Sequence, residues 1–208
     1  MKKILGCIVL LLAGALAGAA DDFPLHKGAT EIGVFASGGS GLGVADSIQM
    51  VNAGVRLGRV LTNEHGSGWK RGNFEYAFDF LPFYYFMQDQ YFCTTVACTS
   101  IYAKRQHVYG GSMTPIILKW NFTRSKRVVP FAAAEGGVVF TTHNVPAGDT
   151  SQVNFTPGVA AGVQWFRGPR SAFSLSGHVT HISNASLGNY NPGMNATIFM
   201  RVGYQWWR

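Results

Sequence analysis

The sequence predicts an antiparallel barrel of eight β-strands that spans the outer membrane, and three observations lead to this fold class. After the first twenty residues no run of about eighteen apolar residues remains, so no transmembrane helix is expected. Only 13% of the residues are charged, a low share for a soluble domain. Segments with apolar residues at alternate positions recur along the chain. An exported chain of this kind satisfies its backbone polar groups within a membrane by closing into a barrel.

Residues 1–20 are expected to be a signal peptide. A short basic start, Lys2-Lys3, precedes the apolar run Ile4–Ala17, and Ala17-Gly18-Ala19 fits a small-residue cleavage site with cleavage after Ala19 or Ala20. An uncleaved anchor is the alternative, but the apolar run is shorter than the ~20 residues that a membrane span needs. The barrel is therefore expected over residues 21–208 as one domain.

Eight segments with strand periodicity follow, each long enough for the ~9–11 tilted residues that cross a bilayer. They are Ala29–Ser37, Ser47–Leu61, Trp69–Phe86, Gln106–Phe122, Val128–Thr142, Gln152–Phe166, Ser171–Ser183 and Asn195–Trp207. Proline cannot donate a ladder hydrogen bond, so Pro115, inside the fourth segment, predicts a bulge or a shifted boundary there.

The connections between these segments alternate in length. The short ones are Thr62–Gly68, Thr123–Arg127 and Arg167–Arg170, and the mostly longer ones are Gly38–Asp46, Met87–Arg105, His143–Ser151 and Asn184–Met194. Outer-membrane barrels have short periplasmic turns and long outer loops, which places both termini in the periplasm. A lipocalin-like soluble barrel also has eight strands, but it needs a polar exterior.

Two segments show which residues face lipid and which face the lumen. In the last segment Ile198, Met200, Val202, Tyr204 and Trp206 share an apolar face, and Thr197, Arg201 and Gln205 lie on the other. In the third, an aromatic face opposes Glu75 and Asp79. These two and Glu135 are expected to form a lumen network with Arg56, Arg59 or Arg201. His178 is expected to be a hydrogen-bonding residue of the lumen, with a role as a second base as the alternative.

The net charge and the cysteines indicate which binding partner, disulfide and metal sites to expect. Without Lys2 and Lys3 the chain has 15 basic and 10 acidic side chains, a net charge of about +5. Because no nucleic-acid motif accompanies this charge, the phosphates of lipopolysaccharide are the expected partner. Cys93 and Cys98 are closely spaced in an exported chain, which favours a disulfide in a loop. Two thiols are too few for a metal site, and no cofactor or metal is expected.

The strand predicted over Ser171–Ser183 carries the candidate chemistry. Phe173, Leu175 and Val179 lie on its apolar face, which ends in His181 and Ser183. Two polar side chains at the end of a lipid-facing stripe are costly and therefore informative. Residues two apart on a strand share a face, so the imidazole could take the serine proton as Oγ attacks an ester carbonyl. The alternative is a polar strand end at the headgroup level.

A longer pattern surrounds this pair. His181-Ile182-Ser183-Asn184-Ala185, then Asn191-Pro192-Gly193 and a closing strand with Gly203-Tyr204, resembles the signature of the lipid A 3-O-deacylase family. The resemblance implies an eight-stranded outer-membrane barrel that removes the ester-linked 3-hydroxyacyl chain of lipid A. It implies Ser183 as the nucleophile and His181 as the base, with Asn184 and Asn191 shaping the oxyanion site or its loop.

One position departs from that pattern. The family's acidic third member follows the serine by twelve residues, where this chain has Asn195. An amide can orient the imidazole but adds no full negative charge. Regular alternation also puts Asn195 on the opposite face from Ile198 and Met200, unless a bulge or a loop intervenes. The second functional hypothesis is therefore a barrel without enzymatic activity, with a structural, adhesive or small-channel role.

Overall fold

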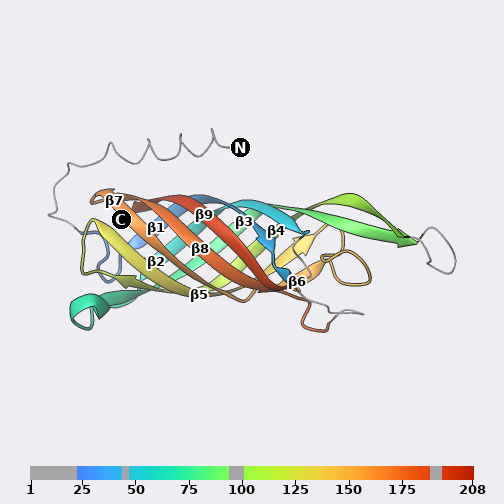
Figure 1. Cartoon of the computed structure of the whole chain (residues 1–208). Helices are drawn as coiled ribbons and strands as arrows, with labels where there is room; N and C mark the ends of the chain where they lie inside the picture. Colours follow the sequence, from blue (N-terminus) through green and yellow to red (C-terminus); the bar gives the residue numbers. More distant parts are fainter. Residues whose placement is uncertain (1–22, 44–46, 94–100, 188–193) are drawn as a thin grey trace.

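The computed structural model describes residues 23–43, 47–93, 101–187 and 194–208, and the backbone alone of 194–196. The predicted signal peptide, Cys98 and Asn191 lie outside these residues and stay predictions. Within the described ranges the chain forms a closed antiparallel β-barrel (Figure 1). Its strands are β1 (Thr30–Gly41), β2 (Gln49–Val60), β3 (Gly72–Cys93), β4 (Ile101–Phe122), β5 (Val128–Thr141), β6 (Val153–Phe155), β7 (Gly158–Gly168), β8 (Ser171–Ile182) and β9 (Met194–Trp207).

Neighbouring strands pair around the barrel, and β1 closes it by pairing with β9. β6 and β7 both pair with β5, one beyond the other, so they share one position in the barrel wall. The predicted fold class, an eight-stranded antiparallel transmembrane barrel, is confirmed. None of the described residues forms a helix with the length and apolar character that a membrane span requires.

Two predicted segments differ from the structure. The segment predicted over Gln152–Phe166 is divided at Thr156-Pro157, because Pro157 has no N–H to donate to a ladder. Much of the predicted connection Met87–Arg105 is instead strand, since β3 and β4 stay paired from Met87↔His107 up to Cys93↔Ile101. Figure 1 shows this hairpin extending beyond the other strands. The bulge expected at Pro115 is confirmed, as both registers of β4 shift there.

The outside of the barrel is apolar. Ile198, Met200, Val202 and Trp206 of β9 are 41–59% exposed, as predicted, whereas Thr197 and Gln205 are buried. A stripe of this kind is stable only against lipid, since large contiguous apolar surfaces are rare on soluble barrels. The barrel is therefore an outer-membrane protein, as its alternation predicts.

The inside is filled in three layers. An apolar cluster closes one end with Leu25, Ala29, Val60, Val129, Phe166, Ala172 and Trp207. A second, larger apolar cluster near the other end includes Phe35, Leu81, Phe86 and Phe199. A polar layer of buried, paired charges lies in the lumen with them. Eight tilted strands leave an interior that side chains can fill, which matches this packing.

The two ends of the barrel differ. The connections β2–β3, β4–β5 and β7–β8 gather at one end, here named the turn end, together with Phe23–Ala29 and Arg208 (Figure 1). The opposite end, named the loop end, carries the connections β1–β2, β3–β4, β5–β6 and β8–β9. Short turns face the periplasm in outer-membrane barrels, so the loop end faces outward.

Candidate active site

β8 presents a lipid-facing stripe that ends in a histidine. Phe173, Leu175 and Val179 are 38–46% exposed, while Ser176, His178 and most of the other alternate residues are buried. This is the alternation that the sequence predicts. His181 continues the outward stripe at the loop end and is half-buried. Its backbone N–H donates to the Pro157 carbonyl at 2.9 Å, so the break between β6 and β7 supports this part of β8.

Ser183 follows one residue after the end of β8, and a short bridge positions it. Its N–H donates to the Phe155 carbonyl at 3.2 Å, and the Phe155 N–H donates to the Ser183 carbonyl at 2.7 Å. Extended pairing keeps Ser183 on the same side as His181, two residues earlier. Ser183 is only 7% exposed, more covered than its place in a lipid-facing stripe suggests.

Asn184 organises the turn that comes next. Its Oδ1 accepts the N–H of Ser186 at 2.9 Å, and its carbonyl accepts the N–H of Leu187 at 2.9 Å. Ala185 and Ser186 have φ angles of 51° and 61°, a left-handed conformation that costs free energy in residues other than glycine. Tight side-chain bonding of Asn184 holds this conformation directly beside the candidate nucleophile.

Asn195 lies at a register shift between β8 and β9. Thr180 pairs with Thr197, but the next pair is Ile182 with Met194, so β9 contains one extra residue over Asn195-Ala196. An extra residue changes the alternation of a strand. The face of Asn195 therefore does not follow from counting back from Ile198, and the parity objection raised by the sequence is removed.

The site so built contains a sheltered serine hydroxyl, a histidine on the same side and a strained turn, all at the lipid-facing loop end. Among the described residues no hydrogen bond joins the side chains of His181 and Ser183. Catalytic hydrogen bonds are often long in free enzymes and shorten in the substrate complex. The arrangement is suited to acyl transfer from an ester whose chain lies in the bilayer.

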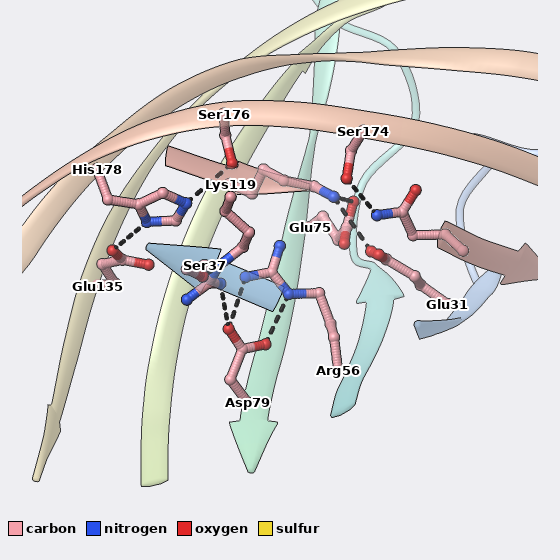
Figure 2. A network of polar contacts seen from close by, with 12 residues as sticks. Glu31, Ser37, Arg56, Glu75, Asp79, Lys119, Glu135, Ser174, Ser176 and His178 are labelled. Atoms are coloured by element: carbon pink, nitrogen blue, oxygen red, sulfur yellow. Dashed lines mark hydrogen bonds and ion pairs between the residues drawn. The ribbon is translucent and has the colours of Figure 1, made fainter. Parts of the chain in front are cut away.

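The acidic residues of the lumen form the network that was expected, with partly different partners (Figure 2). Asp79 accepts from Arg56 at 2.7 and 2.8 Å and from Arg201 at 2.7 Å. Glu31 and Glu75 share Lys119, at 3.1 and 2.8 Å. Of the three arginines that were considered as partners, Arg56 and Arg201 join the network, whereas Arg59 is exposed on β2.

A second serine and histidine lie inside this network. The Ser176 hydroxyl is 2.9 Å from His178 Nε2, and His178 Nδ1 is 2.7 Å from Glu135 (Figure 2). The bonding order is that of a serine triad. The adjoining cavity, however, has a volume of only about 40 Å³, room for water but not for an acyl chain. Sequence reasoning identified His178 and Glu135 as lumen residues, but it did not pair them, since strand alternation says nothing of contacts across a barrel.

In the part of the chain that the structure describes, no group of three or more His, Cys, Asp or Glu side chains is placed to hold a metal ion. Cys93 at the tip of the β3–β4 hairpin is disulfide-bonded. Its predicted partner Cys98 lies outside the described residues, so that pairing stays a prediction.

Comparison with known protein families identifies a family for this chain. The model of the family described as "Lipid A 3-O-deacylase (PagL)" matches residues 71–205, from the start of β3 to the end of β9. The match covers more than half of the chain and includes His181, Ser183 and Asn195. A search of curated proteins found no match.

Solved structures of outer-membrane barrels are similar to this chain in fold. The outer membrane enzyme PagL has a TM-score of 0.51 with 18% identity, covering 83% of this chain and 97% of that one. The N-terminal β-barrel domain of OprF from Pseudomonas aeruginosa has a TM-score of 0.52 with 12% identity, covering 88% and 98%. Neisserial surface protein A has a TM-score of 0.50 with 12% identity, covering 86% and 99%. The barrel shape by itself thus does not separate an enzyme from the other barrels.

Proposed function

Because the chain belongs to the lipid A 3-O-deacylase (PagL) family, we propose that it is an outer-membrane esterase that removes the ester-linked 3-hydroxyacyl chain from lipid A. Ser183 is the nucleophile and His181 is the general base in this proposal. Asn195 orients the imidazole, and Asn184 and Asn191 shape the oxyanion site and its loop. The enzyme needs no cofactor.

The proposed reaction proceeds in two steps. His181 takes the proton of Ser183 Oγ as that oxygen attacks the ester carbonyl carbon, and the imidazolium then gives the proton to the departing sugar oxygen. Water activated by His181 next hydrolyses the acyl-serine and releases a 3-hydroxy fatty acid. An ester is the suitable target, because an alkoxide leaves more readily than an amine.

One observation carries this proposal: His181 continues the lipid-facing stripe of β8, and Ser183, which is mostly buried, lies two residues after it at the loop end. Lipid A lies in the outer leaflet, so its ester bonds meet the barrel wall at this height. An acyl chain can lie along Val179 and Phe155, which are 46% and 39% exposed. The low exposure of Ser183 keeps bulk water away from the hydroxyl before the ester arrives.

The test compares two serines that each lie two residues from a histidine, Ser183 and Ser176. Ser183→Ala is expected to abolish release of hydroxy fatty acid from purified lipid A, measured by mass spectrometry of lipid and product. Removing one hydroxyl near the loop end is expected to leave the barrel folded. Folding is checked by heat-modifiable gel mobility.

Ser176→Ala is the matched control, because Ser176 also lies two residues from a histidine, with which it bonds, but faces the closed lumen. We expect it to retain activity. Unchanged lipid A cleavage by a folded Ser183→Ala barrel excludes the mechanism. Loss of activity in Ser176→Ala alone transfers the chemistry to the lumen.

A further inference from the structure

The basic residues of the barrel lie away from the candidate active site. Each turn at the turn end carries at least two of them, as in Lys70-Arg71 and Arg167–Arg170. Of the described lysines and arginines outside the lumen, only Lys104 and Arg105 lie at the loop end, and Arg105 is bonded to Asp89 at 3.0 Å. The positive charge that the sequence assigned to lipopolysaccharide phosphates therefore lies mainly on the periplasmic side.

An open groove lies within this basic end. It has a volume of about 1220 Å³, and its basic side chains are His26, Lys126, Arg170 and Arg208. They come from the segment before β1, the β4–β5 turn, the β7–β8 turn and the residue after β9. Four separate parts of the chain thus direct basic groups toward one space.

The remaining wall of the groove is apolar and opens onto the lipid-facing surface. Ile32 and Trp206 line it, and they are paired neighbours on β1 and β9 with exposed fractions of 49% and 47%. Trp206 packs edge-on against Tyr204, which packs in the same way against Phe173. Such an aromatic girdle marks the boundary between acyl chains and headgroups.

The charges of the groove are available to a ligand. In the described part of the chain, Lys126, Arg170 and Arg208 form no ion pair within bonding distance, although Lys126 interacts electrostatically with Glu64. Glu64, the described acidic residue of the turns at this end, is bonded by Arg71 Nε at 2.7 Å. Guanidinium groups bind phosphate oxygens with two parallel hydrogen bonds, so the site is matched to a phosphate.

We infer that this groove binds an anionic phospholipid of the periplasmic leaflet. The phosphate lies among Lys126, Arg170 and Arg208, and an acyl chain lies along Ile32 and Trp206. The apolar wall and the girdle select a lipid over a free phosphate, and the periplasmic position selects a phospholipid over lipid A. This inference is independent of the chemistry at Ser183, at the opposite end of the barrel.

Native mass spectrometry of the full mature barrel in detergent tests the inference, with phosphatidylglycerol as the probe. We expect a discrete one-to-one adduct at low lipid concentration. The double variant Arg170→Gln/Arg208→Gln removes two phosphate partners and is expected to weaken this binding about 30-fold. Each basic residue near a lipid surface contributes about 1 kcal/mol to binding, and each 1.4 kcal/mol corresponds to about one tenfold change in the dissociation constant.

The control is Lys70→Gln/Arg124→Gln, which removes two exposed charges from the same end but outside the groove. Phosphatidylglycerol binding is expected to be unchanged in it. Equal weakening in both doubles means that only a diffuse positive surface exists and overturns the site. Equal binding of phosphatidylcholine overturns the role of the charges. If lipid A binds more tightly than phosphatidylglycerol, and the groove variant abolishes that binding, the choice of lipid is overturned.

Discussion

At the scale of single residues, the face of a strand decides which serine and histidine can act on lipid. β8 and the residue after it hold two such pairs, Ser176 with His178 and His181 with Ser183. The first has the better hydrogen bonds, but it is enclosed in the lumen. The second has the weaker geometry but lies at the loop end, where the proposed reaction places the acyl ester. Access therefore outweighs pre-formed geometry in choosing the candidate site.

Asn195→Glu tests the third member of that site. The register shift on β9 leaves Asn195 free of the parity that a regular strand imposes. A carboxylate here keeps a hydrogen-bond acceptor and adds a charge that stabilises the imidazolium formed during attack. We expect the rate of fatty-acid release to rise or stay unchanged. In a serine protease the opposite change, from acid to amide, lowers the rate ~10⁴-fold. The gain in rate here should be far smaller, because glutamate is longer by one methylene than asparagine.

The measurement is the rate of fatty-acid release by folded wild-type and Asn195→Glu barrels under the same conditions. Asn195→Leu is the companion variant, expected to lower the rate because it removes the acceptor. A folded Asn195→Glu barrel without activity shows that the amide itself is required and that the proposed role is wrong.

Asp79→Asn tests the lumen network. Asp79 is 1% exposed and bonds two arginines, so the amide leaves two buried positive charges without a counter-charge. We expect unfolding to become easier by about 3–5 kcal/mol, measured by urea titration of the barrel in lipid.

Asp89→Asn is the comparison, since its ion pair with Arg105 is one-quarter to one-third exposed. Such a pair contributes about 0–1 kcal/mol. If both variants lose the same free energy of unfolding, the lumen network is not the dominant polar contribution to the stability of the barrel.

At the scale of elements, alternation predicted the barrel well and its irregularities less well. The observed bounds of β2, β5, β8 and β9 lie within two residues of the predicted ones. Pro115 signalled its bulge, but the sequence alone did not show that Pro157 separates two strands and supports His181. That role depends on which distant carbonyl faces the His181 N–H, and no local pattern encodes it.

The β3–β4 hairpin is the largest element-scale surprise. It continues beyond the last partners of its neighbours, Gln49 in β2 and Thr141 in β5. Its outer part is held by ladder bonds, by the stacked rings of Phe92 and Tyr102 and by the disulfide of Cys93. The sequence was interpreted as a loop there because polar and aromatic residues mix without a buried face.

The disulfide of this hairpin is expected to join Cys93 to Cys98 and to protect the hairpin tip. Thiol titration of unreduced, denatured mature protein should find no free cysteine. In Cys93→Ser/Cys98→Ser, trypsin should cut after Lys104 or Arg105 severalfold faster, because the free tip frays while the barrel stays folded. Two free thiols in the wild-type protein, or equal cleavage of both proteins, contradict the expected bridge.

At the scale of the whole molecule, the sequence predicted two faces for each strand but not the pairs that form across the lumen. Glu75 and Asp79 were recognised as lumen residues from β3 alone. The bonds from Lys119 to Glu31 and Glu75 and from Arg201 to Asp79 link strands that are far apart in the sequence. Closure of the barrel brings these side chains together, and closure depends on the tilt and register of every strand.

The filled lumen separates the two functional hypotheses at this scale. Apolar clusters and the charged layer occupy the inside, and the two cavities lined by these lumen residues have volumes of only about 10 and 40 Å³. A hydrated ion needs a continuous water-filled path, and buried ion pairs of this kind open only at a large cost in free energy.

We therefore expect the purified barrel to give no steady conductance in planar lipid bilayers at moderate voltage and salt. A porin inserted in the same bilayers provides the positive control, and release of hydroxy fatty acid by the same preparation shows that the barrel is folded. Stepwise openings of the wild-type barrel, at a frequency proportional to the protein added, would favour the small channel over the esterase.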